Sequence, residues 1–405
     1  MNIKYKFEKI FLLSIVILFT LKLSLNAQGF KGYYQYPDIH KNTIVFTAEG
    51  DIWKVDIKGG LAQRLTTHPE EERYANISPD GKTLAYSASY EGPTEIYTMP
   101  INGGITTRWT YESENSTVTN WSPDNKIIYQ TQAYNKLPDE QLVTIDLVSK
   151  VKTVVPLYQA SEGIQNSDGT WIFIRPADHG DAAKRYVGGT ARQIWKFDGE
   201  NEAIKLTKDY DGESHKPMWY NGRVYFITDR DGIMNIWSMD SNGNDLKQHT
   251  KHNNYDVRYA NIDNGNIVYQ HGADLWLLNI SSGNYDKLNI SLASDLDQLR
   301  EKWDENPSRY ITSVNPDPKG EKIAITARGR VFVVPIKSGR IISFTEQNGV
   351  RYRDAFFSHD GENIITLSDQ SGEFEFVKFN SNGEGVHSNI TNDGNILRYQ
   401  GIPSP

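Results

Sequence analysis

The residues best suited to acid–base or metal chemistry are nine histidines. They are His40, His68, His179, His215, His249, His252, His271, His359 and His387. A helical zinc site needs two histidines four residues apart beside a glutamate, and the sequence has no such pattern. His249 and His252 are three apart, but Lys247 and Lys251 flank them and disfavour a cation. Because most of the nine adjoin turn residues, we predict solvated loop histidines.

Two aspartate-rich segments offer the oxygen ligands that calcium prefers. They are Asp209-Tyr210-Asp211-Gly212-Glu213 and Asp229-Arg230-Asp231-Gly232. A calcium loop alternates its oxygen ligands and ends in a distal glutamate, and neither segment completes that pattern. Aspartate and glycine are also the residues that tight turns require. We therefore interpret both segments as turns and predict neither a metal site nor a cofactor.

Motifs for a nucleophile or a phosphate loop are incomplete as well. Gly212-Glu213-Ser214-His215-Lys216 lacks the second glycine of a serine nucleophile elbow. Gly188-Gly189-Thr190 is not followed by the Lys-Ser/Thr pair of a phosphate loop, so we interpret it as a flexible loop. The chain has no cysteine, which excludes thiol nucleophiles and disulfides. The sequence therefore predicts no catalytic, cofactor-binding or metal-binding residue.

The charge balance and the N-terminus bear on partners and location. A net charge of −8 without a basic stripe argues against nucleic acid. Lys4, Lys6 and Lys9 precede an apolar run from Ile10 to Phe19, and a small residue, Ala27, follows. This is the plan of a secretory signal peptide, and the run is short for a membrane span. We predict a signal peptide over 1–27, a periplasmic or secreted bacterial protein, and no membrane span after cleavage; an uncleaved anchor is the alternative.

The strands and turns that would position the residues described above follow a sequence repeat. Its turns are Ser78-Pro79-Asp80-Gly81-Lys82, Ser122-Pro123-Asp124-Asn125-Lys126, Ser167-Asp168-Gly169, Asp317-Pro318-Lys319-Gly320 and His359-Asp360-Gly361. Its apolar pairs are Ile52-Trp53, Ile96-Tyr97, Leu142-Val143, Ile194-Trp195, Ile236-Trp237, Leu275-Trp276, Val331-Phe332 and Phe376-Val377. The second members lie 39 to 56 residues apart. This period, with turns between short apolar runs, predicts four-stranded β-propeller blades whose tryptophans pack in the core.

An interruption of the repeat divides the chain into two parts. Residues 28–290 hold six units, which predicts a six-bladed β-propeller. Residues 291–308 are charged, lack strand alternation and predict a linker with about two helical turns. Two units and the start of a third, at Gly394-Asn395-Ile396-Leu397, follow in 309–405. The predicted fold is all-β, a six-bladed β-propeller followed by the first blades of a second. An incomplete ring exposes an apolar face, so we expect a fragment of a longer protein.

Several phrases resemble one family. The opening run from Tyr36-Pro37-Asp38-Ile39-His40 to Gly50-Asp51-Ile52-Trp53 resembles the start of tricorn proteases and their exported bacterial homologues. Further matching stretches are Gly188-Gly189-Thr190-Ala191-Arg192-Gln193-Ile194-Trp195, Tyr225-Phe226-Ile227-Thr228-Asp229, Ala327-Arg328-Gly329-Arg330-Val331-Phe332, Gly349-Val350-Arg351 and Ser368-Asp369-Gln370-Ser371-Gly372-Glu373. The resemblance implies a second propeller of seven blades, then a helical domain, a PDZ domain and a serine-peptidase core.

The resemblance also implies a function. The family's propellers act as passages for peptides into and out of an oligomeric chamber. This chain would be the non-catalytic propeller portion of such an enzyme, with peptides, its own C-terminal peptidase domains and further copies of itself as partners. The family's catalytic residues lie in regions that this chain lacks, so the chain alone should be inactive. A basic pair that holds the peptide's carboxylate in the archaeal enzyme corresponds here to Tyr111-Glu112-Ser113-Glu114-Asn115. This acidic loop would repel a carboxylate, so no binding residue is carried over.

Two other functions stay open at this point. A TolB-like periplasmic propeller would act only as an interaction scaffold. A relative of prolyl oligopeptidase would carry its propeller before an α/β-hydrolase domain with a G-x-S-x-G elbow.

Overall fold

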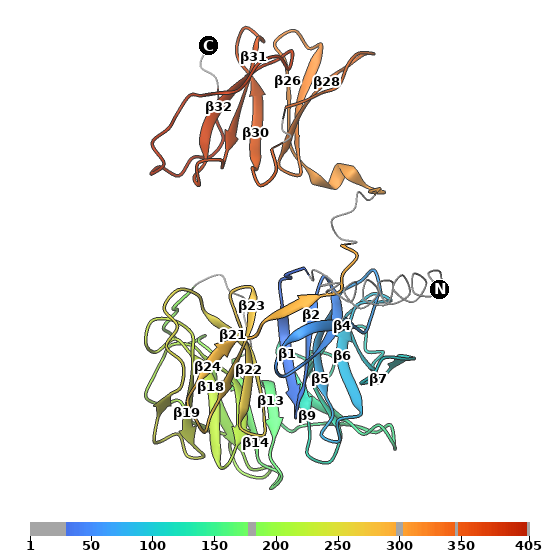
Figure 1. Ribbon diagram of the computed structural model, residues 1–405, viewed down its shortest axis with the longest axis vertical. Coiled ribbons are helices and arrows are strands. Elements are labelled where there is room, and N and C mark those ends of the chain that lie inside the picture. Colours follow the sequence, from blue (N-terminus) through green and yellow to red (C-terminus); the bar gives the residue numbers. More distant parts are fainter. Residues whose placement is uncertain (1–29, 177–183, 297–302, 345–346, 403–405) are drawn as a thin grey trace, which may run out of the picture. The chain divides into compact units, whose positions relative to one another are not determined.

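The computed structural model describes residues 30–176, 184–296, 303–344 and 347–402 (Figure 1). The chain divides into two compact units, Met1–Leu299 and Arg300–Pro405. The signal peptide predicted at 1–27 lies outside the described residues. Among those residues no helix is long and apolar enough to cross a membrane.

The first unit is built from six sheets, each based on a four-stranded antiparallel meander formed by one continuous stretch of chain; the first gains a fifth strand. The first blade contains β1 (Gln35–His40), β2 (Thr43–Ala48), β3 (Asp51–Asp56) and β4 (Gly60–Arg64). The second contains β5 (Glu72–Ile77), β6 (Thr83–Ala88), β7 (Glu95–Pro100) and β8 (Thr107–Arg108). The third contains β9 (Ser116–Trp121), β10 (Ile127–Thr131), β11 (Gln141–Ile145) and β12 (Lys152–Val154).

The remaining blades repeat the same meander. The fourth contains β13 (Ser161–Gln165), β14 (Trp171–Arg175), β15 (Gln193–Phe197) and β16 (Ile204–Lys205). The fifth contains β17 (Ser214–Tyr220), β18 (Arg223–Thr228), β19 (Asn235–Asp240) and β20 (Lys247–Gln248). The sixth contains β21 (Val257–Asp263), β22 (Asn266–His271), β23 (Asp274–Asn279) and β24 (Tyr285–Lys287).

The six blades form a closed ring. Each first strand contacts the first strands of both neighbouring blades, and β21 returns to contact β1. First strands are therefore the innermost strands of the ring. A further strand, β25 (Ile290–Leu292), adds to the outer edge of the first blade by pairing parallel to β4. The first predicted domain ends at 290, whereas β25 extends the first unit to Leu292 because its apolar side chains pack against β4.

The predicted turns connect the first and second strands of their blades. In the second blade, the hydroxyl of Ser78 donates to Asp80 over 2.6 Å and accepts the backbone N–H of Thr83 over 3.0 Å. Gly81 takes a φ of +75°, a conformation that favours glycine. The repeat of serine, aspartate and glycine is therefore a turn signal, as the sequence predicted.

The apolar pairs of the repeat lie in the third strands. Their aliphatic members are buried between blades, as Ile52, Ile96 and Ile236 show with no exposed surface. In the first unit the aromatic members face an aromatic residue of the second strand, as Trp53 faces Phe46. Trp53 is fully buried, as the core prediction requires, whereas Trp195, Trp237 and Trp276 are half-buried. Trp195 lies beneath the guanidinium of Arg175, 5.2 Å from its ring centroid.

The second unit begins with a short 3-10 helix, η2 (Pro307–Tyr310), and contains two blades. The first has β26 (Ile311–Pro316), β27 (Lys322–Ala327), β28 (Arg330–Pro335) and β29 (Ile342–Ser343). The second has β30 (Tyr352–Phe357), β31 (Asn363–Ser368), β32 (Glu375–Asn380) and β33 (Ser388–Asn389). The predicted start of a third blade carries no strand among residues 390–402. Instead the N–H of Gly394 donates to Glu375 over 2.7 Å, which holds this segment against β32.

Candidate functional site

The innermost strands share an irregularity that turns one side chain out of the sheet. In β1, β5, β13, β17 and β21 the strand pairing shifts at a β-bulge. At each bulge one residue has a positive φ; the five are Tyr36, Tyr74, Glu162, Lys216 and Tyr259. This conformation is unfavourable for residues other than glycine, and such strain concentrates at functional sites. The bulges therefore mark the centre of the ring as the candidate site.

Three of these side chains are tyrosines that meet at the axis of the ring. The ring centroid of Tyr36 lies 4.4 Å from that of Tyr74 and 4.4 Å from that of Tyr259. Tyr74 and Tyr259 are 6.0 Å apart although they belong to the second and sixth blades, which are not neighbours. Side chains from such blades come together only near the axis. Burial raises the pKa of Tyr74 and Tyr259, so both phenols stay neutral.

The opposite side of the axis is charged. The carboxylate of Glu162 accepts the backbone N–H of Lys216 and lies 3.7 Å from Nδ1 of His215. Burial alone would raise the pKa of Glu162, but the contact with His215 and the nearby cations outweigh it and lower the pKa to about 2. Burial lowers the pKa of Lys216. We call Tyr36, Tyr74, Glu162, Lys216 and Tyr259 the axial plug.

A cavity of about 470 Å³ lies against the axial plug and is called the axial cavity here. Tyr74, Glu162, Lys216 and Tyr259 line it together with Thr117 of β9. Its other walls are loops that precede first or third strands; their lining residues include Lys184, Arg192, Glu213, Asn254 and Asp256. The cavity therefore opens at the end of the ring where the first and third strands begin.

Ion pairs hold the loops around the mouth. The ammonium of Lys184 lies 3.0 Å from Asp256, and Nε of Arg192 lies 2.6 Å from Glu213. Asp229 is 4% exposed and uses Oδ1 to accept from the hydroxyl of Tyr210 over 2.9 Å, whereas its Oδ2 has no hydrogen-bond partner. Burial raises the pKa of Asp229. The mouth thus combines aromatic walls with fixed charges of both signs.

The two aspartate-rich segments lie side by side as turns. Arg230 donates to Asp209 over 2.9 Å and lies above the rings of Tyr210 and Trp237. The guanidinium of Arg230 is therefore the cation that pairs with Asp209 between these two segments. No group of three or more His, Cys, Asp or Glu residues in the described ranges is arranged to hold a metal ion. Ser214, the other candidate in this region, donates its hydroxyl to Thr228 over 3.1 Å.

The prediction that the histidines are solvated loop residues is wrong for several of them. His271 is 6% exposed and stacks on His252 with ring centroids 3.7 Å apart. Burial lowers the pKa of His252 to about 4. His215 lies on a first strand at the axial cavity. Aromatic neighbours and the ends of strands bury these rings. The turn residues next to them in the sequence do not reveal this burial. His359 is exposed as predicted, and His179 lies outside the described residues.

The acidic loop at residues 111–115, which stands where the family has a basic pair, was expected to repel a carboxylate, and the structure limits that expectation. Glu112 accepts from the hydroxyl of Tyr129 over 2.9 Å and from the ammonium of Lys152 over 2.7 Å. Burial alone would raise the pKa of Glu112, but the hydrogen bonds from Lys152, Tyr134 and Tyr129 together outweigh it and lower the pKa. Lys152 thus balances the charge of Glu112 within the third blade. Only Glu114, which is exposed, is left in this loop to repel a carboxylate.

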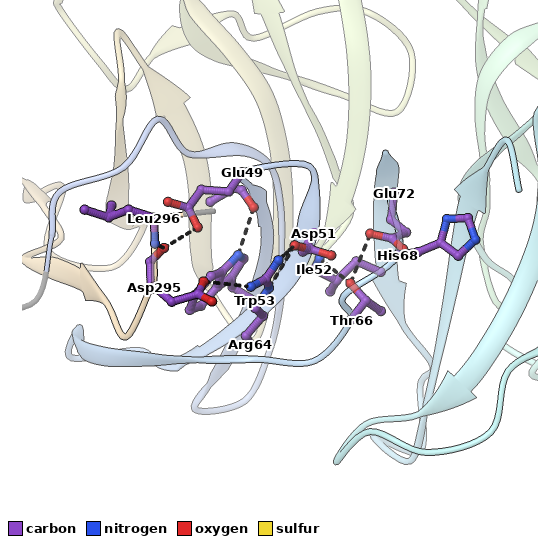
Figure 2. Close-up of polar contacts among 12 residues, drawn as sticks. Glu49, Asp51, Ile52, Trp53, Arg64, Thr66, His68, Glu72, Asp295 and Leu296 are labelled. Carbon is purple, nitrogen blue, oxygen red and sulfur yellow. Dashed lines mark hydrogen bonds and ion pairs between the residues drawn. The ribbon is translucent and has the colours of Figure 1, made fainter. Parts of the chain in front are cut away.

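A polar network that the sequence did not reveal ties the end of the first unit to its first blade (Figure 2). Figure 2 shows Arg64 between two acids: its Nε donates to Asp51 over 2.8 Å, and its Nη1 lies 3.5 Å from Asp295. The hydroxyl of Ser294 donates to Glu49 over 2.6 Å. Because β25 runs parallel to β4, this segment leaves the first unit at the same end as the mouth of the axial cavity.

Comparisons with known proteins agree with this architecture. The family model described as the tricorn protease N-terminal beta propeller domain matches residues 31–284. Tricorn protease homolog 1 of Streptomyces coelicolor is 28% identical over 349 residues, which cover 84% of this chain and 32% of that protein. The tricorn protease homolog of Saccharolobus solfataricus is 28% identical over 344 residues, with the same coverage of 84% and 32%.

A solved structure is similar in fold. The crystal structure of the tricorn protease matches with a TM-score of 0.72 and 24% identity, over 91% of this chain and 36% of that one. The chain spans about a third of the length of the curated relatives it matches. Because the family model covers more than half of the sequence, the chain belongs to the family of tricorn protease N-terminal β-propeller domains.

Proposed function

We propose that this chain is the non-catalytic propeller portion of a tricorn-like serine peptidase. In this proposal, peptides enter the axial cavity of the six-bladed propeller on their way to or from a peptidase core. Family membership supports the connection with a protease. The observation that carries the role in handling peptides is the axial cavity itself, which lies at the centre of a closed ring and combines tyrosine walls with charges of both signs. Pockets of this size and lining suit small ligands.

The test is to measure binding and turnover with the same peptides. A fluorescent peptide should bind the purified chain, and binding should be lost when a tryptophan at Thr190 fills the mouth of the cavity. Prolonged incubation should leave the peptide intact. Hydrolysis that a serine-directed inhibitor abolishes would show that the chain is itself a peptidase. Peptide binding that the substitution at Thr190 leaves unchanged would refute the role of the axial cavity.

Export is the second part of the proposal. The basic start, apolar run and small residue at 27 support a signal peptide over residues 1–27 and a periplasmic or secreted protein. Expressed in a bacterium with its N-terminus intact, the chain should be recovered outside the cytoplasm with a new N-terminus near Gln28. Recovery of the uncleaved chain in the membrane fraction would favour the anchor instead.

Assembly is the third part. The chain would act with the family's peptidase domains and with further copies of itself. Its match to tricorn proteases over about a third of their length supports the first association. Mass measurement by light scattering should show an oligomer when the chain is produced together with a tricorn-type peptidase core. A mixture of separate monomers would contradict this part.

A further inference from the structure

A second cavity, of about 790 Å³, lies in the sixth blade and is called the rim pocket here. The residues that give it its chemistry are Tyr33, Tyr255, Gln270, His271 and Trp276. Lys184, Tyr255 and Asp256 line both this pocket and the axial cavity, so the two cavities adjoin. A ligand that approaches the mouth of the axial cavity therefore also meets the rim pocket.

Aromatic rings form one wall of the rim pocket. The ring of His271 lies edge-to-face against Trp276, with centroids 5.4 Å apart, and against Tyr255, with centroids 6.0 Å apart. Tyr255 is 62% exposed, so most of its surface is open to a further contact. Aromatic rings pack favourably against one another in this edge-to-face arrangement. The wall therefore suits a flat ring.

Two buried acceptors also line the pocket. Gln270 is 1% exposed, and its amide nitrogen donates to the hydroxyl of Tyr33 and to the carbonyl of Gly272, each over 3.2 Å. Its Oε1 is buried and has no hydrogen-bond partner among the described residues. An amide oxygen only accepts, and a buried acceptor without a partner is costly. Gln270 thus offers an acceptor to a ligand.

His271 supplies the second acceptor. Its Nε2 is buried without a hydrogen-bond partner in the described part of the chain, so the bond that His271 makes with the backbone of Tyr255 comes from Nδ1. Burial lowers the pKa of His271, and the bond to Tyr255 opposes this only in part. The imidazole is therefore neutral at neutral pH. A neutral imidazole that donates through Nδ1 accepts through Nε2.

The charges in the wall are paired. The ammonium of Lys184 lies 3.0 Å from Asp256, and that of Lys287 lies 3.5 Å from Asp274. These pairs balance one another, so the pocket does not select for a charged ligand. The chemistry that fits is a neutral, flat ring that donates a hydrogen bond. The phenol of tyrosine and the indole of tryptophan have this chemistry, whereas phenylalanine has the ring without the donor.

We propose that the rim pocket binds a tyrosine or tryptophan side chain of a peptide that lies at the mouth of the axial cavity. The ring packs against Trp276 and Tyr255, and its O–H or N–H donates to Nε2 of His271. Consecutive residues of a strand point to opposite faces, so Gln270 is left to accept an N–H from another part of the peptide. This inference rests on the proposed function and adds to it the kind of side chain that is bound.

The experiment compares four peptides by isothermal titration with the purified chain. Each has two alanines on either side of a central tyrosine, tryptophan, phenylalanine or alanine, with an acetylated amine and an amidated carboxyl. The capped ends remove terminal charge from the comparison. The tyrosine and tryptophan peptides should bind about fivefold more tightly than the phenylalanine peptide, because only they satisfy the buried acceptor. The alanine peptide should bind most weakly.

Three variants locate the preference. His271→Phe keeps a ring but removes the acceptor, so it should bind the tyrosine and phenylalanine peptides alike. Ala273→Trp fills the pocket from its lining and should reduce the affinity of the aromatic peptides to that of the alanine peptide. Ala273 is exposed, so this variant keeps the test valid if His271→Phe does not fold. Ile105→Trp is the control, because Ile105 is 90% exposed and lies outside the pocket lining.

The outcomes separate this inference from the proposed function. Equal affinity for the four peptides, or a preference that Ala273→Trp leaves unchanged, would overturn the role of the rim pocket while leaving peptide binding in the axial cavity intact. If none of the four peptides binds, the proposed function fails and this inference fails with it.

Discussion

At the scale of residues, the blades depend on a repeated threonine. Thr66 accepts the backbone N–H of Ile52 over 2.8 Å and donates to Glu72 over 3.0 Å (Figure 2). The same bond to the N–H of a third strand recurs in other blades, from Thr110, Thr207, Thr250 and Thr391. Each such threonine satisfies a buried donor that the strand ladder does not pair. In these five blades the sequence carries the signal, an apolar or aromatic residue or histidine followed by threonine after the short fourth strand; the third and sixth blades have Pro156 and Asn289 instead.

Replacing Thr66 with valine tests this reading. Valine keeps the volume but removes both bonds, which leaves the N–H of Ile52 without a partner and Glu72 with only the bond from Tyr90. We expect the free energy of unfolding to fall by about 2–3 kcal/mol. Thr67→Val is the matched control, because Thr67 is the exposed neighbour and its replacement should change stability little. Urea denaturation of the two variants measures the difference; equal stabilities would show that the hydroxyl of Thr66 is dispensable.

Glu72 gives the first unit a pH-dependent stability. Burial raises the pKa of Glu72 to about 7, and the bonds from Tyr90 and Thr66 only partly oppose this. The unfolded pKa of a glutamate is near 4.5. Between these values the folded state binds more protons than the unfolded state, so stability is greatest below about pH 4.5 for this group and is lost as the pH rises through about 7.

Glu72→Gln removes this titration. Glutamine keeps a neutral side chain of the same shape, so the decline of the melting temperature between pH 5 and pH 8 should become shallower than in the native chain. Glu70→Gln is the control, since Glu70 is exposed. A slope unchanged by Glu72→Gln would mean that other groups, such as Asp38 with its pKa raised by burial to about 7, account for the whole dependence.

At the scale of elements, β25 is the strand that fastens the end of the first unit to its first blade. Leu292 is 1% exposed and packs with residues of that blade, and its N–H donates to Phe30 over 2.9 Å. Leu292→Ala should lower the free energy of unfolding of the first unit by about 2–5 kcal/mol, the usual cost of such a cavity. Leu61→Ala on β4 is the control, because Leu61 is 55% exposed. Calorimetry would contradict the role of β25 if both variants melted alike.

Element positions were predictable from the sequence to different degrees. The Ser-Pro-Asp-Gly-Lys turn at residue 78 and the pair at Ile52-Trp53 identify the first hairpin and the third strand, because both signals are local. The predicted boundary between residues 290 and 291 divides β25, since three residues are too short to show alternation and its partner β4 is distant in sequence. Distance in sequence also explains why the axial cavity was not predicted. Its members are far apart in the chain, and only the near-repeat of Tyr74-Ala75-Asn76-Ile77 in Tyr259-Ala260-Asn261-Ile262 pointed to a shared role.

At the scale of the whole molecule, the closed ring accounts for the candidate site. Six innermost strands surround one axis and all six carry a pairing shift, and a positive φ at this shift in five of them gathers residues from positions 36 to 259. The ion pairs at the mouth and the axial plug then line one cavity at the centre of the ring. The second unit, with two blades, packs through its own core of residues such as Val331, Ala355 and Phe357. We therefore expect peptides to bind on the axis of the first unit.

Photo-crosslinking tests that claim most directly. A short linear peptide with a photoreactive group at one end is irradiated with the purified chain, and the modified residues are identified by mass spectrometry. We predict crosslinks to Tyr74, Thr117, Lys216 or Tyr259, all of which line the axial cavity. An excess of the same peptide without the photoreactive group should suppress them. Crosslinks confined to the outer strands of the blades, or to the second unit, would contradict the account.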